Sequence, residues 1–481
     1  MDSRPNVVMI VIDQMRRSAL GVNGHACAAH TPHLDQLARE GVNFTRAYSA
    51  CPSCIAARAS MWTGLEHINH GFTGYDSRPE WHYPVTLPGV LAKAGYHTQG
   101  VGKMHVEPAR NLIGFHNVVL HDGFLHDKRR RYRCAAEYDD YLPWLRERLG
   151  PAADICDVGP GCNGYASRCW PWDERWHPTS WVTSESINFL RRRDPTKPFF
   201  LKVSYHRPHS PLDPPQSYFD MYADVEFPAP LRGDWVEHEL SYGQTENPVP
   251  HAKPFRERAR KAYHALISQI DYELNRLFIE LTDRDLWDET LIMVVADHGD
   301  MLYDHNFVRK SLPFEGSSGI PLIMRLPKSM RQGRVGVTDT RLAELRDLFP
   351  TVCEVCGVTP PASLDGQSLL SAAPRQEPIH GEHPSAEWSN HWLCDGHEKY
   401  CWFSQSGREL LFNLDDDPEE YHDLSKEQPA RLAEWRQRLI AKLSDRAEGY
   451  VANGVLQSGR RIMSSQKWAG IGKNATVESG R

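Results

Sequence analysis

Three segments of strand length along the chain are candidates for buried strands, the first of them a continuous apolar run, and each one ends directly in polar residues. The first covers residues 7–12 and is followed by Asp13. The other two cover residues 199–205 and 290–296 and run into histidine-bearing clusters. Continuous apolar runs of this length are typical of strands covered on both faces of a parallel sheet. Because ligands bind at the carboxyl ends of such strands, we expect the chemistry of this protein to collect there.

Segments with helical spacing alternate with these runs. Residues 32–41 repeat apolar positions at helical spacing and end in Gly41, a common stop signal. Residues 256–281 have the spacing of a long amphipathic helix. Strands that alternate with helices predict an α/β fold in which helices flank the sheet.

A change of composition near residues 371–380, where Ser, Ala, Pro, Gln and Glu predominate, predicts a boundary between two units. We expect a catalytic domain over residues 1–375 and a smaller α+β subdomain over residues 376–481. In the second unit, strand-like pieces precede a predicted helix near residues 427–443, and a polar tail is expected from residue 455 onward.

Charge balance and hydropathy exclude two classes of protein. The chain has 481 residues, with 55 Lys and Arg against 62 Asp and Glu, so it offers no basic surface for nucleic acid. No apolar run approaches the roughly 18 residues that span a bilayer, and residues 7–12 lack the cleavage pattern of a signal peptide. We therefore expect a cytoplasmic protein with no membrane partner, whose 11 Cys are thiols rather than disulfides.

The segment around Cys54 combines a thiol with a guanidinium. Cys54 precedes Arg58 by four residues, and a helix is predicted from this point. A helix N-terminus and a guanidinium both favour a nearby anion, so an anion-binding nucleophile is one interpretation; a cysteine-bearing turn before a helix is the other. The pattern Cys-Ile-Ala-Ala-Arg at residues 54–58, followed by Thr63-Gly64, resembles the signature of the formylglycine-dependent sulfatase family. In that family the cysteine is oxidised to formylglycine.

Further segments follow in the order that this resemblance implies, from about residue 5 to 425. Residues 6–14 resemble the first strand with two metal ligands, and Gly-Lys-Met-His at 102–105 resembles the segment that binds sulfate. Residues 205–211 resemble the Pro-His-x-Pro segment, with His206 as a neighbour of the family's candidate. The resemblance implies a metal site of Asp13, Gln14, Cys54, Asp297 and His298, and a catalytic set of Cys54, Arg58, Lys103, His105, His209 and Lys310.

The resemblance also implies a fold and a reaction. The fold is a mixed sheet flanked by helices, as in the alkaline phosphatase superfamily, and the reaction is hydrolysis of a sulfate monoester through formylglycine. Lys103 and Lys310 would neutralise sulfate oxygens, His209 would protonate the leaving oxygen, and His105 would take the proton when the aldehyde reforms. Carboxylate, amide and imidazole ligands suit Ca²⁺ first and Mn²⁺ or Mg²⁺ second. A formylglycine-generating maturase is an implied partner, and Ala56, where most members have Pro, resembles the forms that radical-type anaerobic maturases accept.

Three alternatives remain open at this point. A phosphonate monoester or phosphodiester hydrolase resembles sulfatases in fold and in the Asp-Gln and Asp-His metal pairs, but typically lacks the Gly-Lys-x-His segment. A non-catalytic anion-binding protein would follow if Cys54 were never converted. Finally, Cys51 and Cys54 together with Cys353 and Cys356 match a four-thiolate zinc pattern, although the two pairs lie about 300 residues apart.

The leaving group of the substrate has one weak signal. Four tryptophans crowd residues 170–181, and such rings either stack on sugars or pack in a core. With no export signal, we expect a small sulfated sugar or another small organic sulfate as the substrate.

Overall fold

The apolar run near the start of the chain forms the centre of a large mixed sheet. Strand β1 (Asn6–Ile12) is fully buried and pairs in parallel with β6 (Phe199–Tyr205) on one side and with β7 (Thr290–Val295) on the other. All three runs predicted as buried strands are thus neighbours at the centre of the sheet. The computed structural model describes residues 4–26, 28–123, 125–237, 252–385, 388–460 and 463–465.

This sheet has eight strands in the order β5-β4-β6-β1-β7-β8-β2-β9. The remaining members are β2 (Val42–Phe44), β4 (His97–Gly102), β5 (Asn117–Leu120), β8 (Leu322–Arg325) and β9 (Val337–Asp339). Strand β8 runs antiparallel to both of its neighbours, whereas the other pairs are parallel. The carboxyl ends of β4, β6, β1 and β7 therefore lie along one edge, where a ligand site is expected.

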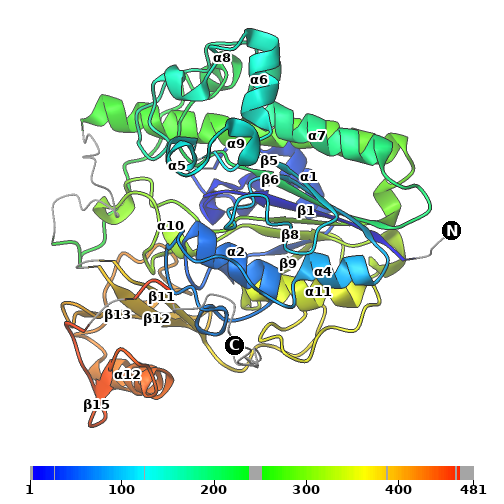
Figure 1. Ribbon diagram of the computed structural model, residues 1–481. Coiled ribbons are helices and arrows are strands. Elements are labelled where there is room, and N and C mark those ends of the chain that lie inside the picture. The colour runs from blue at the N-terminus through cyan, green and yellow to red at the C-terminus, as the bar shows by residue number, and fades with distance from the viewer. Residues whose placement is uncertain are drawn as a thin grey trace.

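Helices cover both faces of the sheet (Figure 1). Helices α7 (Pro178–Arg192) and α9 (Lys253–Asp283) pack together on one face, and α1 (Pro32–Arg39) packs against α9. Helices α2 (Cys54–Thr63), α4 (Leu87–Lys93) and α11 (Leu348–Val355) cover the opposite face. The predicted helices at residues 32–41 and 256–281 are confirmed, and none of the described helices is both long and apolar enough to cross a bilayer.

Shorter helical segments connect these layers. The α-helices are α3 (His67–His70), α5 (Leu125–Arg131), α6 (Tyr141–Leu149), α8 (Gln216–Asp220) and α10 (Glu315–Ser318). Around α6 and α7 the crowded tryptophans pack on aromatic neighbours: Trp181 lies 5.5 Å from Tyr141, and Trp170 lies 5.0 Å from Trp172, between ring centroids. Trp170 and Trp181 are both buried, so for these two rings core packing is the better interpretation.

A second sheet follows the catalytic unit in sequence. Its four antiparallel strands are β11 (Ile379–His383), β12 (Asn390–Cys394), β13 (Glu398–Phe403) and β14 (Glu409–Asn413). Helix α12 (Pro429–Leu443) packs on one face of it, and the other face shares an apolar cluster with Tyr48 and Phe314 of the first unit. Two small pairs complete the strands: β3 (Ala47–Tyr48) with β10 (Ala343–Glu344), and β15 (Val451–Ala452) with β16 (Val455–Leu456).

The expected fold class is confirmed, since a large mixed sheet flanked by helices precedes a small antiparallel sheet with a helix. The division into domains at residue 375 stays a prediction, because the second sheet shares its inner core with the first unit. Most of the expected polar tail, from residue 466 onward, lies outside the described residues.

Candidate active site

The polar residues that end the central strands meet at one point of the sheet edge. Asp13 and Gln14 follow β1, Asp297 and His298 follow β7 after Ala296, and Lys103 follows β4. The four charged or imidazole side chains among them are completely buried, and Gln14 is nearly so. A group of this kind is brought together by the parallel arrangement of the strands and not by closeness in sequence.

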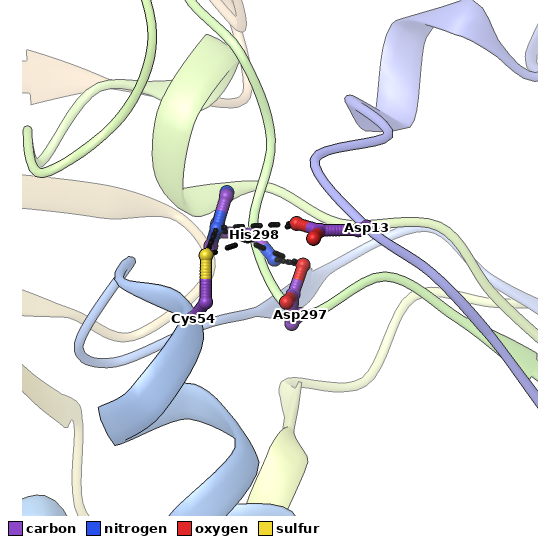
Figure 2. A group of neighbouring side chains, drawn as sticks. All are labelled: Asp13, Cys54, Asp297 and His298. Carbon is purple, nitrogen blue, oxygen red and sulfur yellow. Dashed lines mark hydrogen bonds and ion pairs between the residues drawn. The ribbon is translucent and has the colours of Figure 1, made fainter. Parts of the chain in front are cut away.

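Cys54 reaches this point from the opposite direction, as the first residue of α2. Its Sγ lies 3.1 Å from His298 Nε2 and 3.8 Å from Asp13 Oδ1 (Figure 2). Gly64 ends the helix in the left-handed conformation, and every residue from Cys54 to Thr63 is buried. Residue 54 is therefore held at a helix N-terminus, where an anion is stabilised.

One ligand atom from each of Asp13, Cys54, Asp297 and His298 lies within 4.8 Å of those of the other three. His298 Nδ1 is 3.0 Å from the carbonyl oxygen of Gly299, an arrangement that leaves Nε2 with its lone pair for a metal. Burial and Asp297 act to raise the pKa of Asp13, but Lys103, Lys310 and Arg58 hold it below its ordinary value. Two buried ionised carboxylates beside an imidazole are a donor set that fits a divalent cation.

Three cations surround this anionic pair. Arg58 Nε donates to Asp297 Oδ2 at 3.0 Å, Lys103 Nζ donates to Asp13 Oδ2, and Lys310 Nζ donates to Cys54 Sγ at 3.1 Å. Burial and Asp13 act to raise the pKa of the Cys54 thiol, but Lys103 and Lys310 hold it below its ordinary value. The site is thus arranged to stabilise negative charge at position 54 and on a ligand beside it.

Gln14 contacts both the carboxylate of Asp297 and the ammonium group of Lys310. Its backbone N–H donates to Asp297 Oδ1 at 3.1 Å, and its Oε1 accepts from Lys310 Nζ at 2.9 Å. Its Nε2 donates to Asp300 Oδ2 at 2.7 Å, which orients the amide oxygen toward the cluster. Gln14 has a positive φ of 66°, a conformation that a non-glycine residue adopts only when its surroundings hold it.

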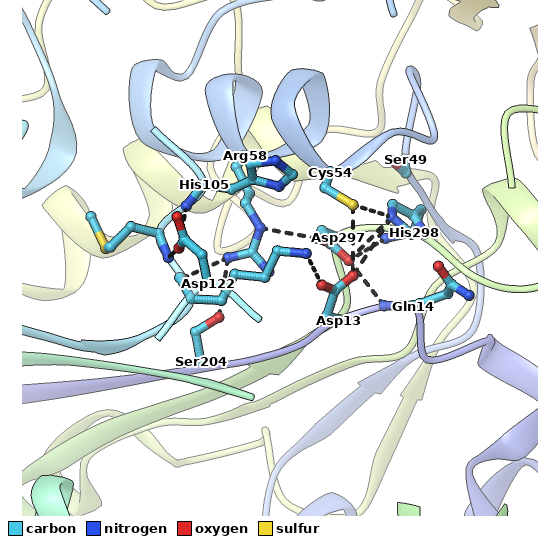
Figure 3. A network of polar contacts seen from close by, with 12 residues as sticks. Asp13, Gln14, Ser49, Cys54, Arg58, His105, Asp122, Ser204, Asp297 and His298 are labelled. Atoms are coloured by element: carbon cyan, nitrogen blue, oxygen red, sulfur yellow. Dashed lines mark hydrogen bonds and ion pairs between the residues drawn. The ribbon is translucent and has the colours of Figure 1, made fainter. Parts of the chain in front are cut away.

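The two predicted catalytic histidines flank the cluster. The backbone N–H groups of Met104 and His105 donate to Asp122 Oδ1 at 2.8 and 2.9 Å, and Figure 3 shows the His105 ring beside Arg58. His209 Nδ1 lies 3.0 Å from the carbonyl oxygen of Ser210. Burial, followed by the nearby lysines, lowers the pKa of both imidazoles well below its ordinary value. Both rings are neutral here and close to the charges of the site.

A comparison of the whole chain with protein-family models shows which family it belongs to. The protein-family model described as Sulfatase matches residues 5–358, which include every predicted site residue. The chain belongs to the sulfatase family. As a member of that family, within the alkaline phosphatase superfamily, it is a sulfuric ester hydrolase.

Individual relatives agree with this membership. An arylsulfatase of Clostridium perfringens is 45% identical over 471 residues, which cover 95% of this chain and 98% of that protein. A phosphonate monoester hydrolase of Agrobacterium radiobacter has the same fold, with a TM-score of 0.73 at 24% identity over 92% of this chain and 96% of that one. A protein solved with its substrate D-glucosamine-2-N,6-O-disulfate gives a TM-score of 0.71 at 19% identity, over 92% and 98%.

The zinc alternative is wrong for this sulfatase. Cys353 and Cys356 are buried in the main core at the end of α11, and burial raises the pKa of both thiols to about 12. Among the described residues, Cys54 is the one cysteine whose sulfur belongs to a group of metal-ligand atoms. The distant pair therefore packs as small apolar side chains.

Several residues of the site were not predicted from the sequence. Ser204 accepts from Arg58 Nη1 at 3.1 Å, and Asp122 holds the His105 backbone. Asp300 follows the predicted Asp297-His298 pair by two residues, so its place in the motif was a signal that we did not use. Ser204 is the last residue but one of a predicted strand, which is a weaker signal.

The C-terminal sheet also reaches the site, and no sequence signal indicates this. Asn390 Nδ2 donates to the carbonyl oxygen of Ser311 at 2.9 Å, directly after Lys310. Lys399 Nζ donates to the carbonyl oxygen of Pro313 at 2.9 Å. Burial, with contributions from the charges of His298 and Lys310, lowers the pKa of His383 to about 3. The second sheet thus holds the loop that carries Lys310.

Proposed function

We propose that this sulfatase hydrolyses a sulfate monoester of a small organic molecule, such as a sulfated sugar or an aryl ester, with residue 54 as the nucleophile. The observation that carries the proposal is the arrangement of three cations around Cys54 and the two carboxylates: Arg58 donates to Asp297, Lys103 to Asp13 and Lys310 to Cys54. Arg58 and Lys103 are completely buried, and Lys310 is partly buried. A sulfate monoester is an anion with three terminal oxygens, so its transition state needs several fixed cationic donors.

Conversion of Cys54 to formylglycine would supply a hydrated aldehyde whose two hydroxyls serve attack and release. Arg58 follows Cys54 by one helical turn, so both side chains lie on the same face of α2. Arg58 Nη2 is buried and has no hydrogen-bond partner in the described part of the chain, which leaves it free to hold the group at position 54. Ala56 still favours a radical-type maturase as the enzyme that makes this conversion.

Asp13, Gln14, Asp297 and His298, with the group at position 54, would hold a divalent cation. We expect Ca²⁺, with Mn²⁺ or Mg²⁺ as the next choices, because the carboxylate and amide oxygens are hard ligands. When bound, the ion would neutralise charge that develops on the sulfate and the nucleophile. The chain's own contribution is to keep both carboxylates ionised through Arg58, Lys103 and Lys310.

The remaining side chains move protons and neutralise the ester. Lys103 and Lys310 would contact sulfate oxygens, and His209 would give a proton to the leaving oxygen. Burial lowers the pKa of His209, and an anionic ester beside it would raise the pKa of the imidazole and favour the protonated form. His105, on the other side near Arg58, would accept the proton when the aldehyde reforms. The cytoplasmic location expected from the sequence remains a prediction.

Loss of Lys103 is expected to separate sulfate monoesters from phosphodiesters. A phosphodiester has one terminal oxygen position blocked by its second ester group, so Lys103 fits the monoester better. We expect the matured enzyme to prefer an aryl sulfate over an aryl phosphodiester in kcat/KM. Lys103→Ala should lower kcat/KM by a factor on the order of 10²–10³ with the sulfate and by a much smaller factor with the diester.

The matched control for this comparison is Lys93→Ala, an exposed lysine on α4 that should leave both rates unchanged. A wild-type preference for the diester, or equal losses on the two substrates in Lys103→Ala, would favour the phosphonate monoester and phosphodiester branch. That branch has one specific support, the fold shared with the Agrobacterium phosphonate monoester hydrolase.

A further inference from the structure

Arg309, the residue before Lys310, is a buried cation whose guanidinium makes no hydrogen bond to any of the described residues. Burial lowers the pKa of this guanidinium, although Tyr165 and Asp300 lie close enough to act in the opposite direction. Arg309 is 4% exposed, and the absence of hydrogen bonds holds for all three of its guanidinium nitrogens. Among the buried arginines in the described part of the chain, no other has all three nitrogens in this state. Burying a charged group whose donors make no hydrogen bond is costly, so such a residue needs a functional explanation.

Other buried arginines of this protein show how the fold normally satisfies them. Arg207 forms a two-pronged ion pair with Asp213, through distances of 2.6 and 2.7 Å. Arg16 donates to Asp304, Ser18 and the carbonyl oxygen of Met301. The absence of hydrogen bonds to the Arg309 guanidinium is therefore a local feature and not a general property of buried arginines in this protein.

The backbone at Arg309 is held by hydrogen bonds, although its guanidinium makes none with the described residues. Its N–H donates to Tyr165 Oη at 2.9 Å and to Asp300 Oδ1 at 3.0 Å. Arg309 and Ser311 have φ values of 67° and 78°, a strained conformation for non-glycine residues, and they flank Lys310 on both sides. Strain of this kind persists where the surroundings fix the backbone to position a functional side chain. Lys310, between these two residues, already has such a function.

The backbone of Arg309 is linked to the segment that carries His209. Tyr165, which binds the Arg309 backbone, follows Gly164, and Gly164 accepts a hydrogen bond from Ser210 Oγ at 2.6 Å. Ser210 follows His209, the proposed proton donor to the leaving oxygen. One short segment thus connects His209, the proposed acid, with the backbone of Arg309.

We infer that Arg309 binds a second anionic group on the leaving-group part of the substrate, a carboxylate or a second sulfate. This inference rests on the proposed function and narrows its substrate class to sulfate esters that carry another negative charge. Guanidinium recognises both anions through paired N–H donors, and it does so more strongly when water is excluded. Asp300 contributes its charge near Arg309 but accepts no hydrogen bond from the guanidinium, because its oxygens accept from Gln14, Tyr165 and the backbone.

The test is a panel of matched aryl sulfates on the matured enzyme. Each pair has a carboxylate substituent, at the ring or on a short linker, and the corresponding carboxamide. A sugar pair, D-glucosamine 2-N,6-O-disulfate and its 6-O-monosulfate, is included. At least one anionic member should exceed its partner in kcat/KM on the order of 10²-fold, and Arg309→Gln should abolish that difference. Arg309→Lys should keep only part of it, because an ammonium lacks the fork.

Thermal unfolding separates a binding role from a structural one. A structural arginine lowers the melting temperature when it is removed, whereas a buried cation without hydrogen bonds should leave Arg309→Gln at least as stable as the wild type. The control is Arg284→Gln, a surface residue paired with Glu280 on α9, which should change neither rates nor preference.

Three outcomes overturn the inference. The first is that the wild type prefers no anionic member of any pair. The second is that Arg309→Gln loses the same factor in kcat/KM on both members of each pair. The third is a clearly lower melting temperature of Arg309→Gln with the preference for the anionic member retained. If the wild type hydrolyses none of the sulfates, carboxamides included, the proposed function itself fails. Hydrolysis of the carboxamides without any preference would overturn the role of Arg309 alone.

Discussion

Cys54→Ser is expected to lose nearly all turnover with an aryl sulfate, on the order of 10³-fold or more in kcat. A serine at this position has a single hydroxyl with which to attack the sulfate ester. Release of sulfate from the enzyme needs a second hydroxyl on the same carbon, which serine lacks. The surrounding cations remain, so substrate binding should persist while cycling stops. The measurement is steady-state hydrolysis by enzyme from a host whose maturase acts on cysteine only.

The control for this prediction is Cys51→Ala. Cys51 is buried three residues earlier, and burial, aided by Glu382, raises the pKa of its thiol well above the ordinary value, so it is inert. We expect this variant to keep most of the wild-type rate. Normal cycling of Cys54→Ser, with the serine shown intact by mass, would contradict the proposed role of residue 54.

Asp297→Asn is expected to remove the divalent cation and with it the activity. The substitution keeps the shape of the side chain but removes the carboxylate that Arg58 contacts at 3.0 Å. The cation would then face Arg58, Lys103 and Lys310 with one anionic ligand fewer, so we expect more than about 10²-fold weaker metal binding. Elemental analysis of the purified proteins measures the effect directly, and chelation of the wild type should reproduce the loss of activity.

Asp288→Asn provides the matched control, because Asp288 is a partly exposed carboxylate that pairs with Arg331 far from the cluster. It should keep both metal and activity. A stoichiometric divalent metal retained by Asp297→Asn, or full activity of the chelated wild type, would show that these four side chains do not form the metal site.

The central part of the fold was predictable because its signals are local. Largely apolar runs identify β1, β6 and β7, because strands covered on both faces are rich in apolar residues, although Lys202 and Ser204 interrupt the run in β6. The order of the strands in the sheet was not predictable, because pairing depends on contacts between residues far apart in sequence. The antiparallel direction of β8 is an example, since nothing within Leu322–Arg325 indicates it.

The residues of the site likewise divide into those that the sequence predicts and those that only the folded structure reveals. Asp13 and Asp297 stand next to predicted strands, so both their identity and their meeting at one edge could be inferred. Lys103 was identified by its Gly-Lys-x-His segment, but the strand β4 before it was not predicted. Asn390 and His383 come from strands of another sheet, and only the packed structure shows that they reach the Lys310 loop. Arginine is a residue type that usually lies at the surface, so the burial of Arg309 with no hydrogen bond from its guanidinium to a described residue is a property of the folded chain alone.

The central claim is that residue 54 is converted to formylglycine and then acts as the nucleophile. Mass spectrometry of the peptide that contains residue 54, taken from active enzyme made in the native host, tests this most directly. We predict that the peptide has lost one sulfur and two hydrogens and gained one oxygen relative to cysteine, in proportion to the specific activity of each preparation. Fully active enzyme whose residue 54 is entirely unmodified cysteine would contradict the account.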